Sequence, residues 1–162
     1  MQHTIAPVYD NKSKVLILGS FPSVKSRDER FYYAHPQNRF WRVLAALLNC
    51  DVPDTIEKKQ KCLLQNNIAL WDVIESCDID GSDDASIRNV IPNNLNRIIE
   101  IADIKRIFTN GGTADKFYRK YCLPQTGISA TRLPSTSPAN AGYRFDRLFE
   151  AWKTVANNLS ER

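Results

Sequence analysis

The chain has 162 residues, of which 43% are hydrophobic and 25% are charged, a composition that excludes a disordered or fibrous protein. The length favours one domain over residues 1–162, and without an apolar run long enough to cross a bilayer or a recognisable export signal we expect a cytoplasmic protein with no membrane association. The net charge of +4 is unevenly distributed, because residues 1–48 and 105–162 are basic and residues 49–104 are acidic. A surface formed by the two ends of the chain could bind a polyanion such as nucleic acid. The alternative is that the charges cluster by chance.

Segments of strand length alternate with segments of helical spacing along the chain. In chain order, the apolar runs predict strands at 15–18, 68–71, 104–108 and 129–133. Apolar stripes and charged surfaces predict helices at 40–48, 54–66, 95–102, 114–121 and 145–159. This alternation is typical of an α/β protein with three α/β/α layers and a central, mostly parallel four-stranded sheet.

In a parallel α/β sheet, ligands bind outside the carboxyl ends of the strands. The candidate site residues are therefore those that follow the predicted strands, at 19–23, 72, 110–112 and 134–140. The four cysteines are widely spaced without a Cys-x-x-Cys pair, and the chain has only two histidines. We therefore predict reduced thiols, mostly in core positions, with no metal and no cofactor.

Three segments have an unusual composition. Gly-Ser-Phe-Pro-Ser at 19–23 is a tight turn, which can serve the backbone alone or offer amide donors to a ligand. The second segment is Tyr33 followed by Ala-His-Pro-Gln-Asn-Arg-Phe-Trp at 34–41, at the start of a predicted helix. Asn38 can therefore be a helix cap or a site residue. Tyr33 can be a core residue or a surface on which a base stacks. Leu-Pro-Ser-Thr-Ser-Pro-Ala-Asn at 133–140 is a stiff loop whose hydroxyls can bind phosphate oxygens or only the loop itself.

In this order, the three segments resemble motifs of the uracil-DNA glycosylase superfamily, and the chain is most similar to its hypoxanthine-DNA (deoxyinosine) glycosylase branch. The resemblance extends from Val15 to the last predicted helix and is most specific at 33–41. It implies a monofunctional DNA glycosylase that flips a deaminated base, above all hypoxanthine, out of damaged double- or single-stranded DNA and excises it by hydrolysis in base excision repair. We expect such an enzyme to act as a monomer.

The resemblance also implies a role for individual residues. Most members of the superfamily carry an Asp or Asn in the first motif to activate water, whereas the segment at 19–23 has neither. In the hypoxanthine branch the catalytic residue is instead the Asn of the second segment. The resemblance therefore assigns this role to Asn38. Tyr33 matches the aromatic that stacks on the base, and Asp72 stands where uracil enzymes carry an Asn that reads the base edge. The full base-binding prediction is Ser20, Phe21, Pro22, Ser23, Tyr33, His35 and Asp72. The loop that grips the DNA strand is predicted to bind through Ser135, Thr136, Ser137, Asn140 and Arg144.

Two other functions stay open. A uracil-DNA glycosylase acting on mismatches or single strands would use the same groups, because uracil and hypoxanthine both present an N–H donor to Asp72. A non-catalytic DNA- or nucleotide-binding module of the same fold would keep the segments without excising a base. A small-ester hydrolase is disfavoured because His35 is the only candidate base and no Ser–His–acid set can be named. Strand cleavage is not expected, because no lysine has the sequence context of a Schiff-base nucleophile.

Overall fold

The computed structural model describes residues 1–160, and its centre is a parallel four-stranded sheet with the strand order β2-β1-β5-β6. The strands are β1 (Val15–Gly19), β2 (Ile68–Asp72), β5 (Arg106–Asn110) and β6 (Ala130–Leu133). The predicted parallel α/β sheet is confirmed. β5 begins and ends two residues later than expected, so that Asn110, which was predicted to terminate the strand, is its last residue.

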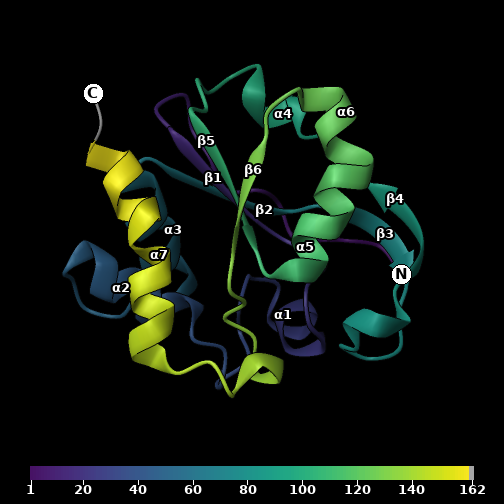
Figure 1. Ribbon diagram of the computed structural model, residues 1–162, viewed down its shortest axis with the longest axis horizontal. Coiled ribbons are helices and arrows are strands. Elements are labelled where there is room, and N and C mark those ends of the chain that lie inside the picture. Colours follow the sequence, from purple (N-terminus) through teal and green to yellow (C-terminus); the bar gives the residue numbers. More distant parts are fainter. Residues whose placement is uncertain (161–162) are drawn as a thin grey trace.

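Helices cover both faces of the sheet (Figure 1). On one side lie α2 (Phe40–Leu48), α3 (Ile56–Gln65) and α7 (Phe145–Ser160). On the other side lie α4 (Asn96–Ile99), α5 (Gly112–Phe117) and α6 (Leu123–Thr126). A π-helical turn at Tyr118–Cys122 joins α5 to α6, so the helix predicted at 114–121 continues for five further residues.

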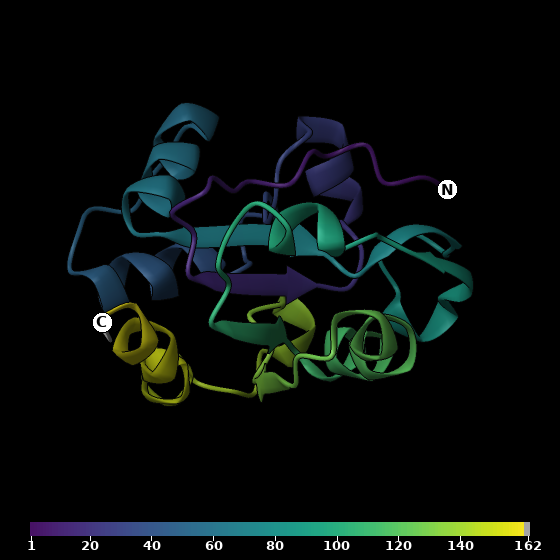
Figure 2. The ribbon, with the colours of Figure 1, turned by 90° about the horizontal axis from the view of Figure 1, so that it is seen from above.

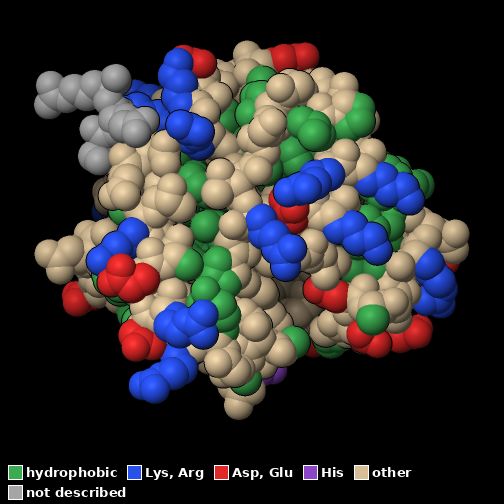
Figure 3. Space-filling model, in the orientation of Figure 1, with side chains coloured by type: hydrophobic (Ala, Val, Ile, Leu, Met, Phe, Trp, Pro, Cys, Tyr) green, Lys and Arg blue, Asp and Glu red, His purple; other side chains and the backbone are tan. Residues whose placement is uncertain are grey.

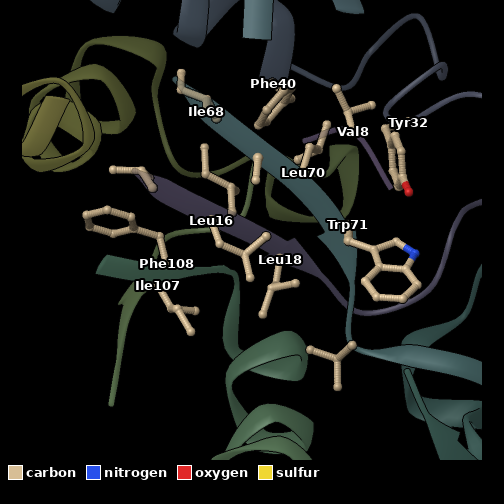
Figure 4. Packing of buried hydrophobic residues seen from close by; sticks show 14 of the residues in the cluster. Val8, Leu16, Leu18, Tyr32, Phe40, Ile68, Leu70, Trp71, Ile107 and Phe108 are labelled. Atoms are coloured by element: carbon tan, nitrogen blue, oxygen red, sulfur yellow. The ribbon is translucent and has the colours of Figure 1, made fainter. Parts of the chain in front are cut away.

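Two strands of the sheet, β1 and β2, show why the sequence pattern predicted them correctly. Every residue of β1 and β2 is buried, because helices cover both faces of these strands, and each strand is therefore a continuous apolar run. Figure 4 shows Leu16 and Leu18 of β1 beside Leu70 of β2, with Phe40 of α2 near them. These side chains form the middle of the hydrophobic core.

The sequence analysis missed an antiparallel hairpin and a short helix. The hairpin consists of β3 (Ile74–Asp78) and β4 (Arg88–Pro92), and the helix is α1 (Val24–Glu29). The hairpin strands are only partly buried and pair with register shifts, so they have neither a continuous apolar run nor a regular alternation. α1 has six residues, of which one is buried, and this is too short for a helical stripe.

The connections between strands diverge at β1 and β5, which are neighbours in the middle of the sheet. From β1 the chain crosses through α2 and α3 to β2 at one edge, whereas from β5 it crosses through α5 and α6 to β6 at the other. Because the two connections cover opposite faces, a crevice opens between the carboxyl ends of β1 and β5. The fold therefore brings the segments that follow these strands to a ligand site.

The N-terminal segment runs along the outer edge of β2 (Figure 2). Val8 pairs with Leu70 of β2, and Gln2 pairs with Ser76 of β3. The backbone N–H of His3 also donates to the carbonyl of Glu75 at 2.6 Å. The segment is thus held beside the hairpin, close to the end of β2.

The four cysteines are free thiols in different surroundings. Cys77 and Cys122 are buried, Cys62 is half-buried and Cys50 is exposed, so the expected core position holds for only part of the set. Burial raises the pKa of Cys122 to about 12 and that of Cys62 to about 11. Within residues 1–160, no helix combines the length and the apolar character that a membrane span needs.

Trp152 of α7 links that helix to α2 and to the loop after β6. Its fully buried ring meets Phe40 edge-on with 5.9 Å between centroids, and its Nε1–H donates to the carbonyl of Pro134 at 2.9 Å. We expect Trp152→Ala to lower the free energy of unfolding by about 3–5 kcal/mol, because it leaves a cavity in the core. Trp152→Phe should cost less because it keeps an aromatic ring. Denaturant unfolding measures both, with the partly exposed Phe149→Ala as control, and a Trp152→Ala loss no larger than that control would contradict the prediction.

Candidate active site

A cavity of about 340 Å³ opens at the carboxyl ends of β1, β2 and β5. Its walls come from the segment after β1, the segment before α2, the β3–β4 loop and the loop after β6, with Asp72 and Asn110 at the ends of their strands. This volume is in the range of sites that bind one small molecule, roughly 300–1,000 Å³. Figure 3 shows a hollow on this side of the molecule, between the region of β6 and α5 and that of the β3–β4 loop.

The structure gathers most of the predicted site residues in this cavity. Its lining includes every predicted catalytic and base-binding residue, namely Ser20, Phe21, Pro22, Ser23, Tyr33, His35, Asn38 and Asp72. Of the predicted DNA-binding residues it includes Ser135, Thr136 and Ser137, whereas Asn140 and Arg144 lie outside it. The roles assigned to the single residues stay predictions. Among residues 1–160, no group of three or more His, Cys, Asp or Glu side chains is arranged to hold a metal ion.

Asp72 is a buried carboxyl group at the end of β2, with 3% of the residue exposed. Its Oδ2 accepts a hydrogen bond from His3 Nε2 at 2.8 Å, and Asn93 donates to its backbone carbonyl at 2.9 Å. Asp72 Oδ1 approaches Gly19 so closely that a Cβ atom there would lie 2.4 Å from it, so this position requires glycine. Sequence analysis missed the contact with His3, because a pair separated by 69 residues leaves no local signal.

Tyr33 contacts the cavity and the core at once. Its ring stacks on Phe40 with 4.1 Å between centroids, so a base can stack only on the other face of the ring. Its backbone has φ +54°, a left-handed conformation that places this ring beside the end of β1. The hydroxyl is buried and makes no hydrogen bond of normal geometry to residues 1–160. Burial raises the pKa of the phenol, nearby Asp72 adds to the rise and the Asn110 amide opposes it, so Tyr33 is neutral at physiological pH.

Asn38 lies at the cavity and at the start of α2 together. Its Oδ1 accepts a hydrogen bond from the backbone N–H of Phe40 at 2.9 Å, so it satisfies a free N–H at the helix start, although the cap position itself is Arg39. The Asn38 NH₂ group has no hydrogen-bond partner within the described residues. Because an amide oxygen has a second lone pair, the same side chain can cap the helix and still bind a water. Beside it, His35 Nδ1 accepts from the N–H of Gln37 at 3.1 Å, so the proton of the neutral ring lies on Nε2.

The loop after β6 is held to the sheet by Asn110. The sequence placed this residue in the candidate segment 110–112 but assigned it no role. Asn110 Nδ2 donates to Thr136 Oγ1 at 3.0 Å, and Asn110 Oδ1 accepts from the Thr136 N–H at 3.0 Å. Thr136 is completely buried, and its carbonyl accepts from the N–H of Arg39 at 3.1 Å. This placement favours a role for Thr136 in holding the loop over the predicted contact with DNA.

The rest of the loop is bonded to itself and to Arg39. The guanidinium of Arg39 donates to the carbonyl of Asn140 at 3.1 Å and to that of Tyr143. Asn140 Nδ2 donates in turn to the carbonyl of Ser135 at 3.0 Å. The hydroxyl oxygens of Ser135 and Ser137 each accept a backbone N–H, so both can still donate their own O–H to a phosphate oxygen.

The rim of the cavity is unevenly charged. In Figure 3, Lys and Arg side chains gather over the region of α5 and β6, above the hollow, and acidic side chains lie beside it over the β3–β4 loop. The cations on these elements and the turn between them are Lys116, Arg119, Lys120 and Arg132, of which Arg119 pairs with Asp115 at 2.9 Å. The β3–β4 loop carries Asp80, Asp83 and Asp84. A polyanion is therefore attracted on one side of the cavity and repelled on the other.

Loss of the Asn110 side chain should loosen the loop after β6. Asn110→Ala leaves the buried N–H and hydroxyl of Thr136 without their partners, so we expect the free energy of unfolding to fall by about 1–3 kcal/mol. Asn110→Asp keeps the acceptor for the Thr136 N–H but removes the donor to Thr136 Oγ1 and buries a carboxyl group, so it should also be destabilising. Denaturant unfolding measures the loss, with Gln60→Ala on the exposed face of α3 as control. If Asn110→Ala were as stable as this control, the loop would be held by other contacts.

Comparison with known proteins identifies the family of this fold and site. The profile of the Uracil DNA glycosylase superfamily matches residues 6–159. The chain is 34% identical over 150 residues to a hypoxanthine DNA glycosylase from Methanosarcina acetivorans, covering 91% of this chain and 93% of that protein. It is 31% identical over 136 residues to the hypoxanthine DNA glycosylase of Methanosarcina barkeri, covering 83% and 85%. A solution NMR structure of a candidate uracil DNA glycosylase from Methanosarcina acetivorans matches with a TM-score of 0.84 and 31% identity over 99% of both chains. The chain therefore belongs to the uracil DNA glycosylase superfamily.

Proposed function

We propose that the protein is a monofunctional DNA glycosylase that excises hypoxanthine from DNA. The observation that carries this proposal is the cavity between β1 and β5, whose lining unites Tyr33, Asn38 and Asp72 with the hydroxyl-rich loop after β6. The two relatives named hypoxanthine DNA glycosylases, which align over most of the chain, support the choice of base.

Entry of a base into the cavity requires that it leave the duplex, which costs a few kcal/mol. Stacking on an aromatic ring returns about 1–3 kcal/mol per base. The free face of Tyr33 can supply this contact, since the opposite face is already held by Phe40. The basic side of the rim and the hydroxyls of Ser135 and Ser137 bind the phosphates beside the flipped nucleotide.

Hydrolysis breaks the bond between sugar C1′ and N9 of hypoxanthine. The electron pair of that bond leaves with the base, and a water oxygen forms the new bond to C1′. The proton that the water releases passes through solvent to the departing base. Asn38 orients this water through its amide but is a poor proton acceptor. The rate therefore depends mainly on stabilising the negative charge of the departing base, for which amides and hydroxyls of the segment at 20–23 act as an oxyanion hole does.

Excision of uracil is the second candidate activity. The observation that favours it is the match to the NMR structure of a candidate uracil DNA glycosylase over 99% of both chains. Uracil also presents an N–H group between two carbonyls, so the Asp72 carboxylate suits it as well as hypoxanthine.

Labelled oligonucleotides that carry one inosine, uracil or xanthine, in single and double strands, test the proposal. After incubation, alkali should cut the inosine strand at the lesion. Without alkali the strand should stay intact, because the lining residues include no lysine that could form a Schiff base with the sugar. Release of uracil alone would support the second candidate. Binding of DNA without release of any base would identify a non-catalytic binding module.

Replacement of Asn38 should separate catalysis from capping. We expect Asn38→Ala to lower the single-turnover rate of hypoxanthine excision by about 10²-fold or more, with little change in DNA affinity, because the water loses its binding group. Asn38→Ser is the matched control, since serine caps a helix start without an amide. It should therefore keep the stability of the parent and still be slow. Activity of Asn38→Ala within threefold of the parent would leave Asn38 only its structural role.

The exposed Arg144 should contribute to the salt dependence of DNA binding. If its guanidinium meets a phosphate, Arg144→Ala flattens the slope of log K against log salt by about one unit. Ser135→Ala and Ser137→Ala should weaken binding with the slope nearly unchanged, because a hydroxyl releases no counterion. Lys58→Ala, an exposed cation on α3, is the control. Equal slopes for Arg144→Ala and this control would contradict the predicted contact.

A further inference from the structure

His3 lies outside the region that the superfamily profile matches, since that region begins at residue 6. Its side chain is 2% exposed and donates to Asp72 Oδ2 at 2.8 Å. We propose that His3 is a positioning residue for base recognition, which orients the Asp72 carboxylate so that Oδ1 accepts the N–H of the flipped base. This inference rests on the proposed function.

The hydrogen bonds of the His3 ring assign its proton. The backbone N–H of Ile5 donates to His3 Nδ1 at 3.2 Å. A backbone N–H can only donate, so Nδ1 carries no hydrogen, and the hydrogen of the neutral ring lies on Nε2. His3 Nε2 is therefore the donor, and Asp72 Oδ2 is the acceptor. The direction of the His3–Asp72 hydrogen bond is thus set by the backbone N–H of Ile5, whether or not a ligand is bound.

The His3 ring is held from several directions. The His3 N–H donates to Glu75 of β3, and the ring meets Phe21 edge-on with 5.9 Å between centroids and Tyr32 at 6.1 Å. Phe21 belongs to the first motif and lines the cavity. Because both its backbone and its ring are fixed, His3 restricts the rotation of the Asp72 carboxylate as well as giving it a partner.

The second oxygen of Asp72 remains for a ligand. Oδ1 has no hydrogen bond to residues 1–160, and Asp72 lines the cavity. Unlike the Tyr33 hydroxyl, Oδ1 is not sealed off from it. A buried carboxylate with one oxygen bonded and the other open has a strong need for a donor. The cavity thus presents a fixed acceptor whose direction is set by His3.

Such an acceptor matches the chemistry that distinguishes a deaminated purine. Hypoxanthine has a hydrogen on N1, which Oδ1 can accept, whereas adenine has a lone pair on N1, which would face the carboxylate oxygen without a proton between them. Fixed geometry strengthens this distinction, because a carboxylate that turns freely could avoid the lone pair. His3 therefore contributes to specificity without touching the base.

A double-mutant cycle on His3 and Asp72 tests the proposal. Single-turnover excision is measured for an inosine duplex with the parent, His3→Ala, His3→Gln, Asp72→Asn and the double variant His3→Ala/Asp72→Asn. The exposed neighbour Thr4→Ala is the control. We expect His3→Ala to lower the rate constant at subsaturating enzyme by about 10- to 100-fold, because misplaced contacts cost this much. His3→Gln should restore most of it, since the glutamine amide can donate. In the Asp72→Asn background, the loss from His3→Ala should fall below about twofold.

The result that would overturn the proposal is an equal loss from His3→Ala in both backgrounds, or a loss that His3→Gln does not restore and that follows the melting temperature. If the parent excises uracil in place of hypoxanthine, the same cycle is run with uracil, whose N3–H is an equivalent donor. A parent that excises neither base refutes the proposed function together with this role. Excision without the coupling refutes only the role of His3.

The tautomer of His3 gives a readout that does not depend on activity. The chain has two histidines, so long-range ¹H–¹⁵N spectra of the parent and of His3→Gln assign the signals of His3. We expect a hydrogen on Nε2 in the parent and a changed ring signal in Asp72→Asn. A hydrogen on Nδ1 in the parent would show that the pair with Asp72 is not formed as described, and would overturn the proposal even if the variants were unstable.

Discussion

Two hydrogen bonds between Asn110 and Thr136 connect the carboxyl end of β5 with the loop after β6, and the arrangement of the site depends on them. Thr136 is fully buried, so its polar atoms must be paired inside the protein. Its carbonyl extends the connection to Arg39, at the start of α2 and next to Asn38. A loop, a strand end and a helix start that are far apart in the sequence are thus held together by one buried residue.

The buried carboxyl group of Asp72 is the main acidic feature of the cavity floor at the end of β2. β2 is apolar up to Trp71, and an unpaired carboxylate at its end would be costly to bury. The hydrogen bond from His3 offsets part of that cost and leaves one oxygen open toward the cavity. Apolar residues at this position could fold as well, and this is why we propose that the acceptor serves the recognition of a ligand.

The β3–β4 hairpin supplies the wall that the sequence analysis missed. Its loop is held to α1, since the N–H of Val24 donates to Ser82 Oγ at 2.9 Å and the guanidinium of Arg27 donates to the carbonyl of Gly81 at 2.7 Å. The acidic groups of this loop face the basic side of the rim across the cavity. The predicted basic face is therefore formed mainly by the C-terminal third of the chain. Arg39, from the first third, instead donates hydrogen bonds to the loop after β6.

By itself, the sequence determined the parallel α/β class, the four strands of the sheet and the segments that follow them. A strand that is buried on both faces must be a continuous apolar run, and this signal is local. The family motifs also assigned most of the residues that line the cavity. Only the tertiary structure decided that His3 meets Asp72 and that Asn110 meets Thr136, because these contacts depend on strand order and on the path of the N-terminal segment, which no local pattern encodes. The β3–β4 hairpin was not predicted for a related reason. Its partly exposed strands are stabilised by each other and by α1, and their residues do not alternate regularly between apolar and polar.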